Sequence, residues 1–292
     1  MAAEERIVSG CLIIIGDEIL SGRTVDANLS FLARRLNEVG VRLTEARVIP
    51  DDEETIVATV NGCRARYDYV FTTGGIGPTH DDITGAAIAK AFGVDWALND
   101  EAHAILTGHY KMTGAELNEA RLKMAHAPVG AELIENPISK APGYRLENVF
   151  VFAGIPAVMQ AMFESIAHRL TGGAPVLSRT VAATLPEGTI AADLGALQER
   201  YPGIDIGSYP FYRRGKFGCS LVLRGTDAAA LGAAADELAA IIRALGEEPI
   251  LGEKGEEPIL GEEGEEPILG EEGGEPILGE KGENPEAGQE AK

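Results

Sequence analysis

Apolar runs of strand length alternate with amphipathic stretches over residues 8–92. Val8 to Ile15 contains a continuous apolar run, which is typical of a strand covered on both faces. Residues 29–36 carry apolar side chains at the spacing of a helix's buried stripe, which ends at Gly40. The alternation continues with strands at 41–49 and 69–73, a helix from 51 or 52, and a helix over 83–92. This order predicts an α/β fold with a doubly wound, mostly parallel sheet.

A second, smaller domain is expected after the first. The pattern predicts a helical region at 100–125, a strand at 143–153 and a helix at 158–170. The stretch 171–175, which contains Gly and Pro, then marks a boundary. Beyond it we expect strands at 177–185, 204–209 and 217–224, and helices at 190–200 and 227–245. The domains are therefore predicted at residues 1–172 and, as a small α+β unit, at residues 173–245.

The rest of the chain, residues 246–292, repeats with a nine-residue period built on Gly-Glu-Glu-Pro-Ile-Leu-Gly-Glu-Lys. A single Ile-Leu pair in such a unit is too little apolar surface to offset the entropy lost on ordering the backbone. We therefore expect a disordered acidic tail, with a repeated adhesive Ile-Leu motif as the alternative. The tail holds 16 Glu and 3 Lys, and so carries −13 of the net charge of −21.

The composition excludes several classes of function. Residues 1–245 carry 22 basic and 30 acidic residues with no basic stripe, so nucleic acid is not an expected partner. No apolar run approaches the ~18 residues of a membrane span, and the start carries Glu4 and Glu5, so we expect a cytoplasmic protein without membrane contact. The three cysteines are far apart in the sequence and lack CxxC spacing, which argues against disulfides and zinc and favours buried or spare thiols.

Glycine and acidic residues gather directly after four predicted strands. In an open parallel sheet, ligands bind beyond the carboxyl ends of the strands, where loops and helix N-termini converge. The unusual residues lie at 16–18, 50–52, 73–82 and 153–156. The sequence therefore predicts a ligand site at this edge of the sheet.

Among these four loops, the physical basis for ligand binding is clearest in the loop at 73–82. Gly74, Gly75 and Gly77 allow positive φ and a close approach of the backbone to a ligand, and the following helix presents free N–H groups suited to a phosphate. A phosphate cradle is therefore one interpretation. The alternative is a tight turn in which Thr79 or Asp81 caps the helix.

Carboxylates beside a phosphate site need a cation between them, because like charges repel. Asp51, Asp82 and either Asp17 or Glu18 are candidates to hold Mg²⁺ or a similar divalent ion that also touches phosphate oxygens. Helix capping is the alternative role of Asp51 and its neighbour Asp52.

Several familiar catalytic motifs do not occur in the sequence. The first strand is not followed by G-x-G-x-x-G, and neither a Walker motif nor a nucleophile elbow is present. His80 is expected to be a hydrogen-bonding loop residue rather than a metal ligand. Metal-assisted attack by water and simple binding remain as the two kinds of activity.

Five segments together resemble a known family. They are GDEILSGRTVDAN (16–28), VIPDD (48–52), TTGGIGPTHDDIT (72–84), NPISKAPG (136–143) and AGIPAVMQAMF (153–163). Residues 8–170, which contain them, resemble the molybdopterin-binding (MoaB/Mog-type) domain. They are more similar to the branch of competence/damage-inducible protein A and of the amino-terminal part of eukaryotic FAD synthases. Residues 176–245 are similar to the small domain that follows it in that branch.

The resemblance implies two activities and a set of site residues. In the competence/damage branch the domain is associated with metal-dependent pyrophosphate hydrolysis of ADP-ribose or FAD, whereas Mog-type relatives adenylylate molybdopterin. A module that binds molybdopterin or a nucleotide without turnover is the third possibility. Asp51 and Asp82 match the acidic catalytic residues and are the expected metal ligands. The expected ligand-binding residues are Thr73, Gly74, Gly75, Gly77, Thr79, Asp17, Glu18, Asn28, Gly154 and Pro156.

We expect a homo-oligomer with a small-molecule nucleotide or pterin as its partner. The sequence also departs from the family pattern, because Ala153 stands where the fourth loop usually has proline. We expect neither the deamidase domain of competence proteins nor the synthase domain of FAD synthases in this chain.

Overall fold

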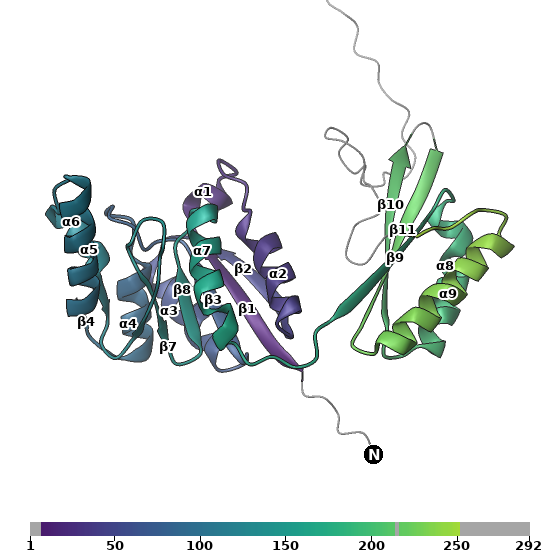
Figure 1. Cartoon of the computed structure of the whole chain (residues 1–292), viewed down its shortest axis with the longest axis horizontal. Helices are drawn as coiled ribbons and strands as arrows, with labels where there is room; N and C mark the ends of the chain where they lie inside the picture. Colours follow the sequence, from purple (N-terminus) through teal and green to yellow (C-terminus); the bar gives the residue numbers. More distant parts are fainter. Residues whose placement is uncertain (1–6, 214–215, 252–292) are drawn as a thin grey trace, which may run out of the picture. The chain divides into compact units, whose positions relative to one another are not determined.

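A computed structural model of the chain describes residues 7–213 and 216–251. It divides into two compact units (Figure 1), of which the first is Met1–Leu177 with Gly225–Asp227 and the second is Ser178–Arg224 with Ala228–Lys292. No helix within the described ranges has the length and apolar character that crossing a membrane requires.

The first unit is built on a six-stranded sheet of order β2-β1-β3-β8-β7-β6. Four neighbouring strands run parallel, namely β2 (Val41–Ile49), β1 (Val8–Ile15), β3 (Tyr69–Thr73) and β8 (Val149–Phe152). The antiparallel strands β7 (Gly143–Leu146) and β6 (Glu132–Ile134) complete the sheet, and β4 (Trp96–Leu98) pairs separately with β5 (His126–Pro128). The predicted α/β fold with a mostly parallel sheet is therefore confirmed.

Helices cover both faces of this sheet, and β1 contributes to a core on each side. Leu12 and Ile14 pack with α2 (Asn28–Glu38) and α7 (Pro156–Ile166), whereas Ile13 and Ile15 pack with α3 (Glu53–Arg64) and α4 (Thr84–Phe92). Because successive side chains point to opposite faces, a strand covered on both sides needs a continuous apolar run. The remaining helices are α1 (Asp17–Leu20), α5 (Asp100–Thr113), α6 (Glu119–Leu122), η1 (Lys123–Ala125) and η2 (Ala167–Arg169).

The structure corrects the strand predicted at 143–153. This segment is a hairpin of β7 and β8, in which Leu146 is paired with Val149. Glu147 between them has a φ of +52°, and Asn148 donates from Nδ2 to the carbonyls of Arg64 and Tyr67. Two-residue hairpins favour such left-handed turn positions. The helical region expected at 100–125 is likewise interrupted, because α5 ends at Gly114 with a φ of +72°.

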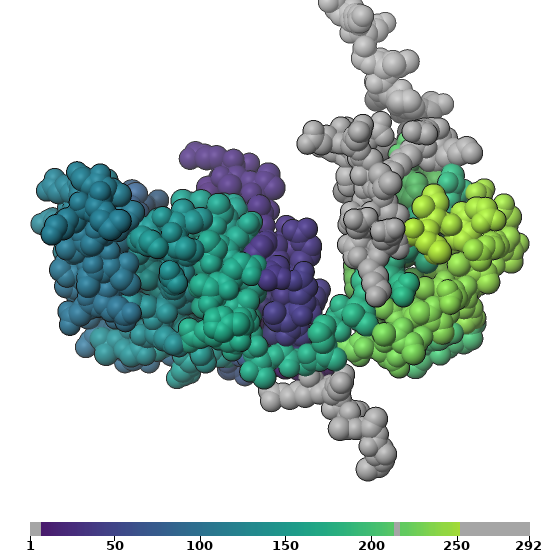
Figure 2. Space-filling view, in the orientation of Figure 1, coloured from purple at the N-terminus to yellow at the C-terminus, as the bar shows by residue number. Residues whose placement is uncertain are grey.

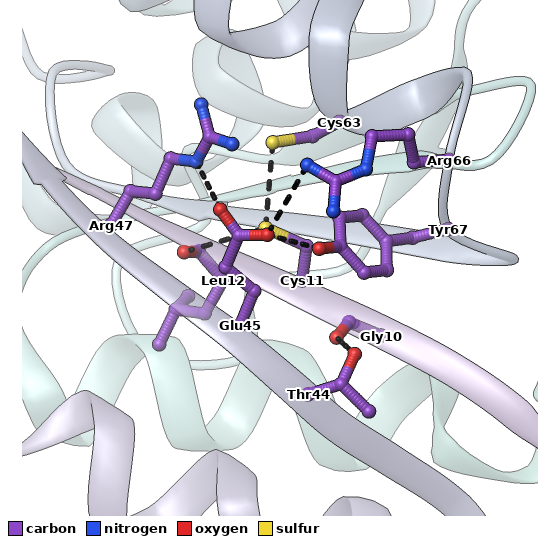
Figure 3. A network of polar contacts seen from close by, with 9 residues as sticks. All are labelled: Gly10, Cys11, Leu12, Thr44, Glu45, Arg47, Cys63, Arg66 and Tyr67. Carbon is purple, nitrogen blue, oxygen red and sulfur yellow. Dashed lines mark hydrogen bonds and ion pairs between the residues drawn. The ribbon is translucent and has the colours of Figure 1, made fainter.

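Two of the cysteines lie side by side although they are far apart in the sequence (Figure 3). Cys11 on β1 and Cys63 on α3 are fully buried, and their sulfur atoms are 3.5 Å apart. Burial raises the pKa of the Cys11 thiol, and the contact with Cys63 raises it further. The Cys11 thiol is therefore a neutral core group, and the burial of both side chains agrees with the expectation of buried cysteines. The nearby Glu45 carboxylate accepts hydrogen bonds from Arg47 and Tyr67.

The second unit holds a smaller antiparallel sheet of order β10-β11-β9-β12. Its strands are β9 (Leu177–Ala183), β10 (Asp205–Arg213), β11 (Lys216–Gly225) and β12 (Ile250–Leu251). The helices α8 (Glu187–Arg200) and α9 (Ala228–Ala244) pack on the sheet, and the core includes Ile190 and Leu197 from α8 and Leu238 and Ile242 from α9. This arrangement confirms the predicted small α+β unit.

The structure differs from the predicted disorder at the start of the tail. Ile250 and Leu251 form β12, antiparallel to β9. The prediction for residues 252–292 falls outside the described residues.

Candidate functional site

The four loops predicted to carry the chemistry meet at the carboxyl edge of the first unit's parallel strands. The Gly16 amide donates to the Ile49 carbonyl at 3.1 Å, and the Gly74 amide donates to the Phe152 carbonyl at 3.2 Å. The Asp17 amide also donates to Oδ2 of Asp51 at 3.0 Å. These bonds link the end of β1 to that of β2, and the end of β3 to that of β8.

The turn after β3 depends on its first two glycines. Gly74 and Gly75 have φ angles of +103° and +66°, a region that glycine adopts without strain. A Cβ atom on Gly74 would lie 2.1 Å from the Ile15 carbonyl oxygen, and one on Gly75 would lie 2.1 Å from the Thr84 hydroxyl. A Cβ on Gly154 would lie 3.3 Å from the Gly74 Cα, so the loop after β8 packs directly on this turn.

Buried polar atoms surround the turn. The hydroxyls of Thr73 and Thr84 have no hydrogen-bond partner among the described residues, although both side chains are almost fully buried. Asn28, the first residue of α2, donates from Nδ2 to the Gly154 carbonyl at 2.8 Å, and its buried Oδ1 also lacks a partner among the described residues. Buried polar groups without partners are costly, and such groups beside a ligand site are suited to bind a polar ligand.

Asp82 is engaged within the loop that precedes α4. Its Oδ2 accepts a hydrogen bond from the Thr79 amide at 2.7 Å and another from the Thr79 hydroxyl. A Cβ atom on Gly77 would lie 2.7 Å from the same Oδ2, so Gly77 leaves room for the carboxylate. Ile83 is the N-cap residue of α4 and makes no side-chain cap, so neither Thr79 nor Asp81 caps this helix.

Asp51 and Asp52 have different roles. Asp52 is the N-cap of α3, where its Oδ2 accepts from the Thr55 amide at 2.8 Å, and the Thr55 hydrogen bonds lower its pKa. Burial raises the pKa of Asp51, and the charges of Asp17, Glu18 and Asp81 raise it further, against the hydrogen bond from the Asp17 amide. Capping therefore belongs to Asp52, and Asp51 is the carboxylate in the acidic cluster.

The predicted carboxylates do not assemble a complete metal centre by themselves. Within residues 7–213 and 216–251, no group of three or more His, Cys, Asp or Glu side chains is placed to hold a metal ion. Asp81 lies near Asp51, whereas Asp82 is bonded to Thr79. His80 is fully exposed, with its ring 3.9 Å from Asp81.

The rim of this edge is exposed and partly apolar. In the space-filling view, α1 and the loop that follows it stand out from the first unit (Figure 2). Glu18 lies in α1, and Leu20 and Val25 are 53% and 89% exposed. On the β8 side, Pro156 is the first residue of α7.

Two lysines in segments at this edge of the sheet were not identified from the sequence. Lys123 of η1 donates from Nζ to the Thr79 carbonyl at 2.5 Å. It comes from a segment 44 residues away, and no motif marks it. Lys140 has a φ of +62° in the loop before β7. Because β7 is antiparallel to β8, this loop lies at the same edge as the glycine turn.

Asn136 organises the Lys140 loop. Its Oδ1 accepts from the amides of Ile138 and Ser139, both at 3.1 Å, and its Nδ2 donates to the Ala141 carbonyl at 2.8 Å. The resemblance included this segment, but no role was predicted for its residues. The NPISKAPG motif was thus the feature of the sequence from which this loop could have been identified.

A hollow of about 690 Å³ lies at the opposite edge of the first unit. It is lined by Val8 and Tyr69, the first residues of β1 and β3, and by Thr171, among others. The glycine turn and the acidic cluster lie at the other ends of these strands. We therefore locate the candidate site at the glycine turn and the acidic cluster, and not at this hollow.

Residues 11–172 match the family described as "Probable molybdopterin binding domain", and residues 175–246 match the one described as "FAD synthase, middle domain". A protein of Pyrobaculum aerophilum is 36% identical over 208 residues, which cover 68% of this chain and 78% of that protein. A CinA-like protein of Citrifermentans bemidjiense is 38% identical over 166 residues, which cover 55% of this chain and 40% of that protein.

The crystal structure of the protein CinA from Thermoplasma acidophilum is also similar. It has a TM-score of 0.51 and 32% sequence identity, and the match covers 55% of this chain and 96% of that one. Nearly the whole of that solved chain thus has a counterpart here.

Proposed function

Because this chain belongs to the molybdopterin-binding domain family, we propose that it binds a phosphate-bearing nucleotide or pterin at the carboxyl edge of its parallel sheet. We further propose that it hydrolyses the pyrophosphate linkage of a substrate such as ADP-ribose or FAD. Adenylylation of molybdopterin and binding without turnover are the alternatives that the experiment below separates.

The observation that carries the proposal is the construction of the turn after β3. Gly74 and Gly75 adopt positive φ where no side chain fits, and the buried hydroxyls of Thr73 and Thr84 lie beside them. A glycine turn of this kind, followed by the N-terminus of a helix such as α4, is a type of structure suited to a phosphate. In the proposed complex, this turn and the two hydroxyls bind phosphate oxygens.

The residues fit the divalent cation that the family implies. Mg²⁺ is usually held by one or two carboxylates together with substrate phosphates, rather than by a cage of protein ligands alone. Asp51 is such a carboxylate, and the pKa raised by burial and by its acidic neighbours means that added positive charge would stabilise its ionised form. Asp51 is therefore one proposed metal ligand, and Asp82 is the second because the family resemblance implies it. A bound cation would supply Lewis acidity toward the phosphate oxygens.

The remaining residues position the substrate and balance its charge. Lys123 holds the Thr79 carbonyl and thereby the loop that carries Asp82. Lys140 adds a second cation at this edge, which favours binding of an anionic phosphate. Asn28 fixes the loop after β8 against α2 through the Gly154 carbonyl.

The test incubates the full chain with Mg²⁺ and ADP-ribose, FAD, or ATP plus molybdopterin, and measures the release of AMP and pyrophosphate. We expect ADP-ribose or FAD to yield AMP, and EDTA to stop the reaction. Pyrophosphate released only from ATP plus molybdopterin would identify the adenylyltransferase instead. Saturable binding of these ligands without any product, under every divalent metal tried, would leave a binding module.

A further inference from the structure

Two residues of the first tail repeat, Ile250 and Leu251, pair with the edge of the second unit's sheet. α9 ends at Ala244, and Gly246, with a φ of +89°, donates from its amide to the Arg243 carbonyl at 3.0 Å. This left-handed turn ends the helix and reverses the chain. Ile250 and Leu251 then form β12 on β9.

The pairing of β12 depends on its backbone more than on its side chains. Ile250 and Leu251 are 53% and 62% exposed, whereas their partners Ala182 and Val181 are both buried, and Val181 belongs to the second unit's own core. A segment added to a sheet edge in this way takes its affinity from main-chain hydrogen bonds. Other segments with the same local sequence therefore have the same capacity to pair.

The same segment recurs three more times in the tail. Pro-Ile-Leu-Gly stands at 249–252, 258–261, 267–270 and 276–279. We infer that the β9 edge is a strand-acceptor site whose occupants are the Pro-Ile-Leu segments of the same chain. When Ile250 and Leu251 leave the edge, Ile259 and Leu260 take their place.

This exchange is favoured by the short distance along the chain. Moving the donor by one repeat lengthens the connection from residues 246–249 to residues 246–258. For a flexible connection, this change lowers the effective concentration of the donor by roughly sixfold. The second repeat is therefore a competent substitute for the first.

Hydrogen exchange of the full chain tests the inference. Prolines at both positions of β12, Ile250→Pro with Leu251→Pro, remove the amides that pair with β9. In the full chain, exchange of a peptide covering β9 should rise by roughly sixfold or less, because the other repeats dock. In a chain that carries the same prolines and ends at Leu251, exchange at this edge should rise much further.

Two controls accompany this experiment. The first tests whether the pairing depends on the backbone amides or on the side chains, and the second tests whether a separate peptide can act as the donor strand. Ile250→Ala with Leu251→Ala, in the chain that ends at Leu251, should keep the protection because its amides remain. Adding the peptide Gly-Glu-Glu-Pro-Ile-Leu-Gly-Glu-Glu to the proline-bearing short chain should restore protection, and a peptide N-methylated at Ile and Leu should not.

Three results would overturn the inference. Equal exchange in the full and short proline variants would mean that the other repeats do not dock. Wild-type exchange equal to that of the short proline variant would mean that β12 does not protect the edge. Protection of the full-length proline variant that grows with protein concentration would assign the donor to a second copy.

Discussion

Gly74 is the residue on which the candidate phosphate site depends most directly. Its φ of +103° and the Ile15 carbonyl, 2.1 Å from where a Cβ would lie, exclude any side chain without a shift of backbone. A non-glycine residue held in such a conformation costs about 1–3 kcal/mol. The turn and the adjoining end of β1 must therefore move together when this glycine is replaced.

Gly74→Ala should destabilise the chain by about 1–3 kcal/mol and weaken binding of ADP-ribose at least tenfold, because the amides of the turn are displaced. Urea unfolding and titration calorimetry measure the two effects. Gly108→Ala is the matched control, since Gly108 lies within α5 and a Cβ there meets nothing within 4 Å. Equal binding by both variants would remove the turn from the site.

Asp81 and Asp82 offer a second test at the residue scale. Asp82→Asn keeps an oxygen that can accept from Thr79, so the fold should be retained. Loss of a charged ligand from the site should lower kcat on the order of a hundredfold. We expect Asp81→Asn, the matched control, to retain much more turnover. Steady-state kinetics and melting curves of both variants decide the question.

Asp82 would be only a loop residue if both variants lost activity mildly, equally and in proportion to their melting temperatures. A large loss in Asp81→Asn alone would instead move the catalytic role to Asp81. Of these two aspartates, only Asp81 is among the residues whose charge raises the pKa of Asp51.

At the scale of elements, the start of α3 separates a structural carboxylate from a functional one. Asp52 accepts from the Thr55 amide and caps the helix, while Asp51 accepts from the Asp17 amide across two loops. These two adjacent acidic residues thus have different roles: one caps a helix and the other links two loops. The capping alternative for this pair therefore applies to Asp52 alone.

The Asp52 cap should make stability depend on pH. Hydrogen bonds from Thr55 lower the folded-state pKa of Asp52, so its contribution is present above the ordinary carboxyl pKa of about 4 and is lost as the pH falls through the lower folded value. Asp52→Ala should lower Tm at pH 7, and the difference from wild type should shrink below about pH 4. Thermal unfolding across this range is the measurement.

Asp52→Asn is the informative control for this cap, because it keeps an acceptor but cannot titrate. We expect it to retain most of the wild-type Tm at pH 7 and to lose the acid-dependent component. A difference between Asp52→Ala and wild type that does not change with pH would contradict the cap.

At the scale of the whole molecule, each unit has its own core. The first is organised around β1 and β3, and the second around β9, β11 and the helices α8 and α9. The candidate site and the family match at 11–172 both belong to the first unit. The similarity to the Thermoplasma acidophilum CinA structure covers 55% of this chain and 96% of that one.

A fragment of residues 1–177 should therefore fold and bind ADP-ribose within about twofold of the affinity of the full chain, because binding sites with no shared contacts are independent. Circular dichroism and titration calorimetry of the fragment test this. A folded fragment that has lost binding would show that the second unit or the tail contributes to the site.

The sequence determined those features that depend on local pattern. The unbroken apolar run of β1 specified a strand with both faces covered, and the alternation of strands and helices specified a parallel sheet. Parallel strands have their carboxyl ends at one edge, so residues after four separate strands were predicted to meet there. The hydrogen bond from Asp17 to Asp51 and the close approach of Gly154 to Gly74 link neighbouring loops at this edge. Gly74 and Gly75 belong to the same class, because positive φ restricts the residue type. Gly77 does not have the expected positive φ, and it instead leaves room for the Asp82 carboxylate.

Only the tertiary structure decided which distant groups touch. Cys11 and Cys63 lie 52 positions apart in the chain, and Lys123 reaches Thr79 across 44 positions, contacts that depend on how whole elements pack. The pairing of Ile250 with Ala182 likewise needed an exposed strand edge near the end of α9, which no local pattern contains. Burial, neighbouring charge and free strand edges are properties of the packed chain, and for that reason the roles of Asp51, Lys123 and the first tail repeat became visible only in the fold.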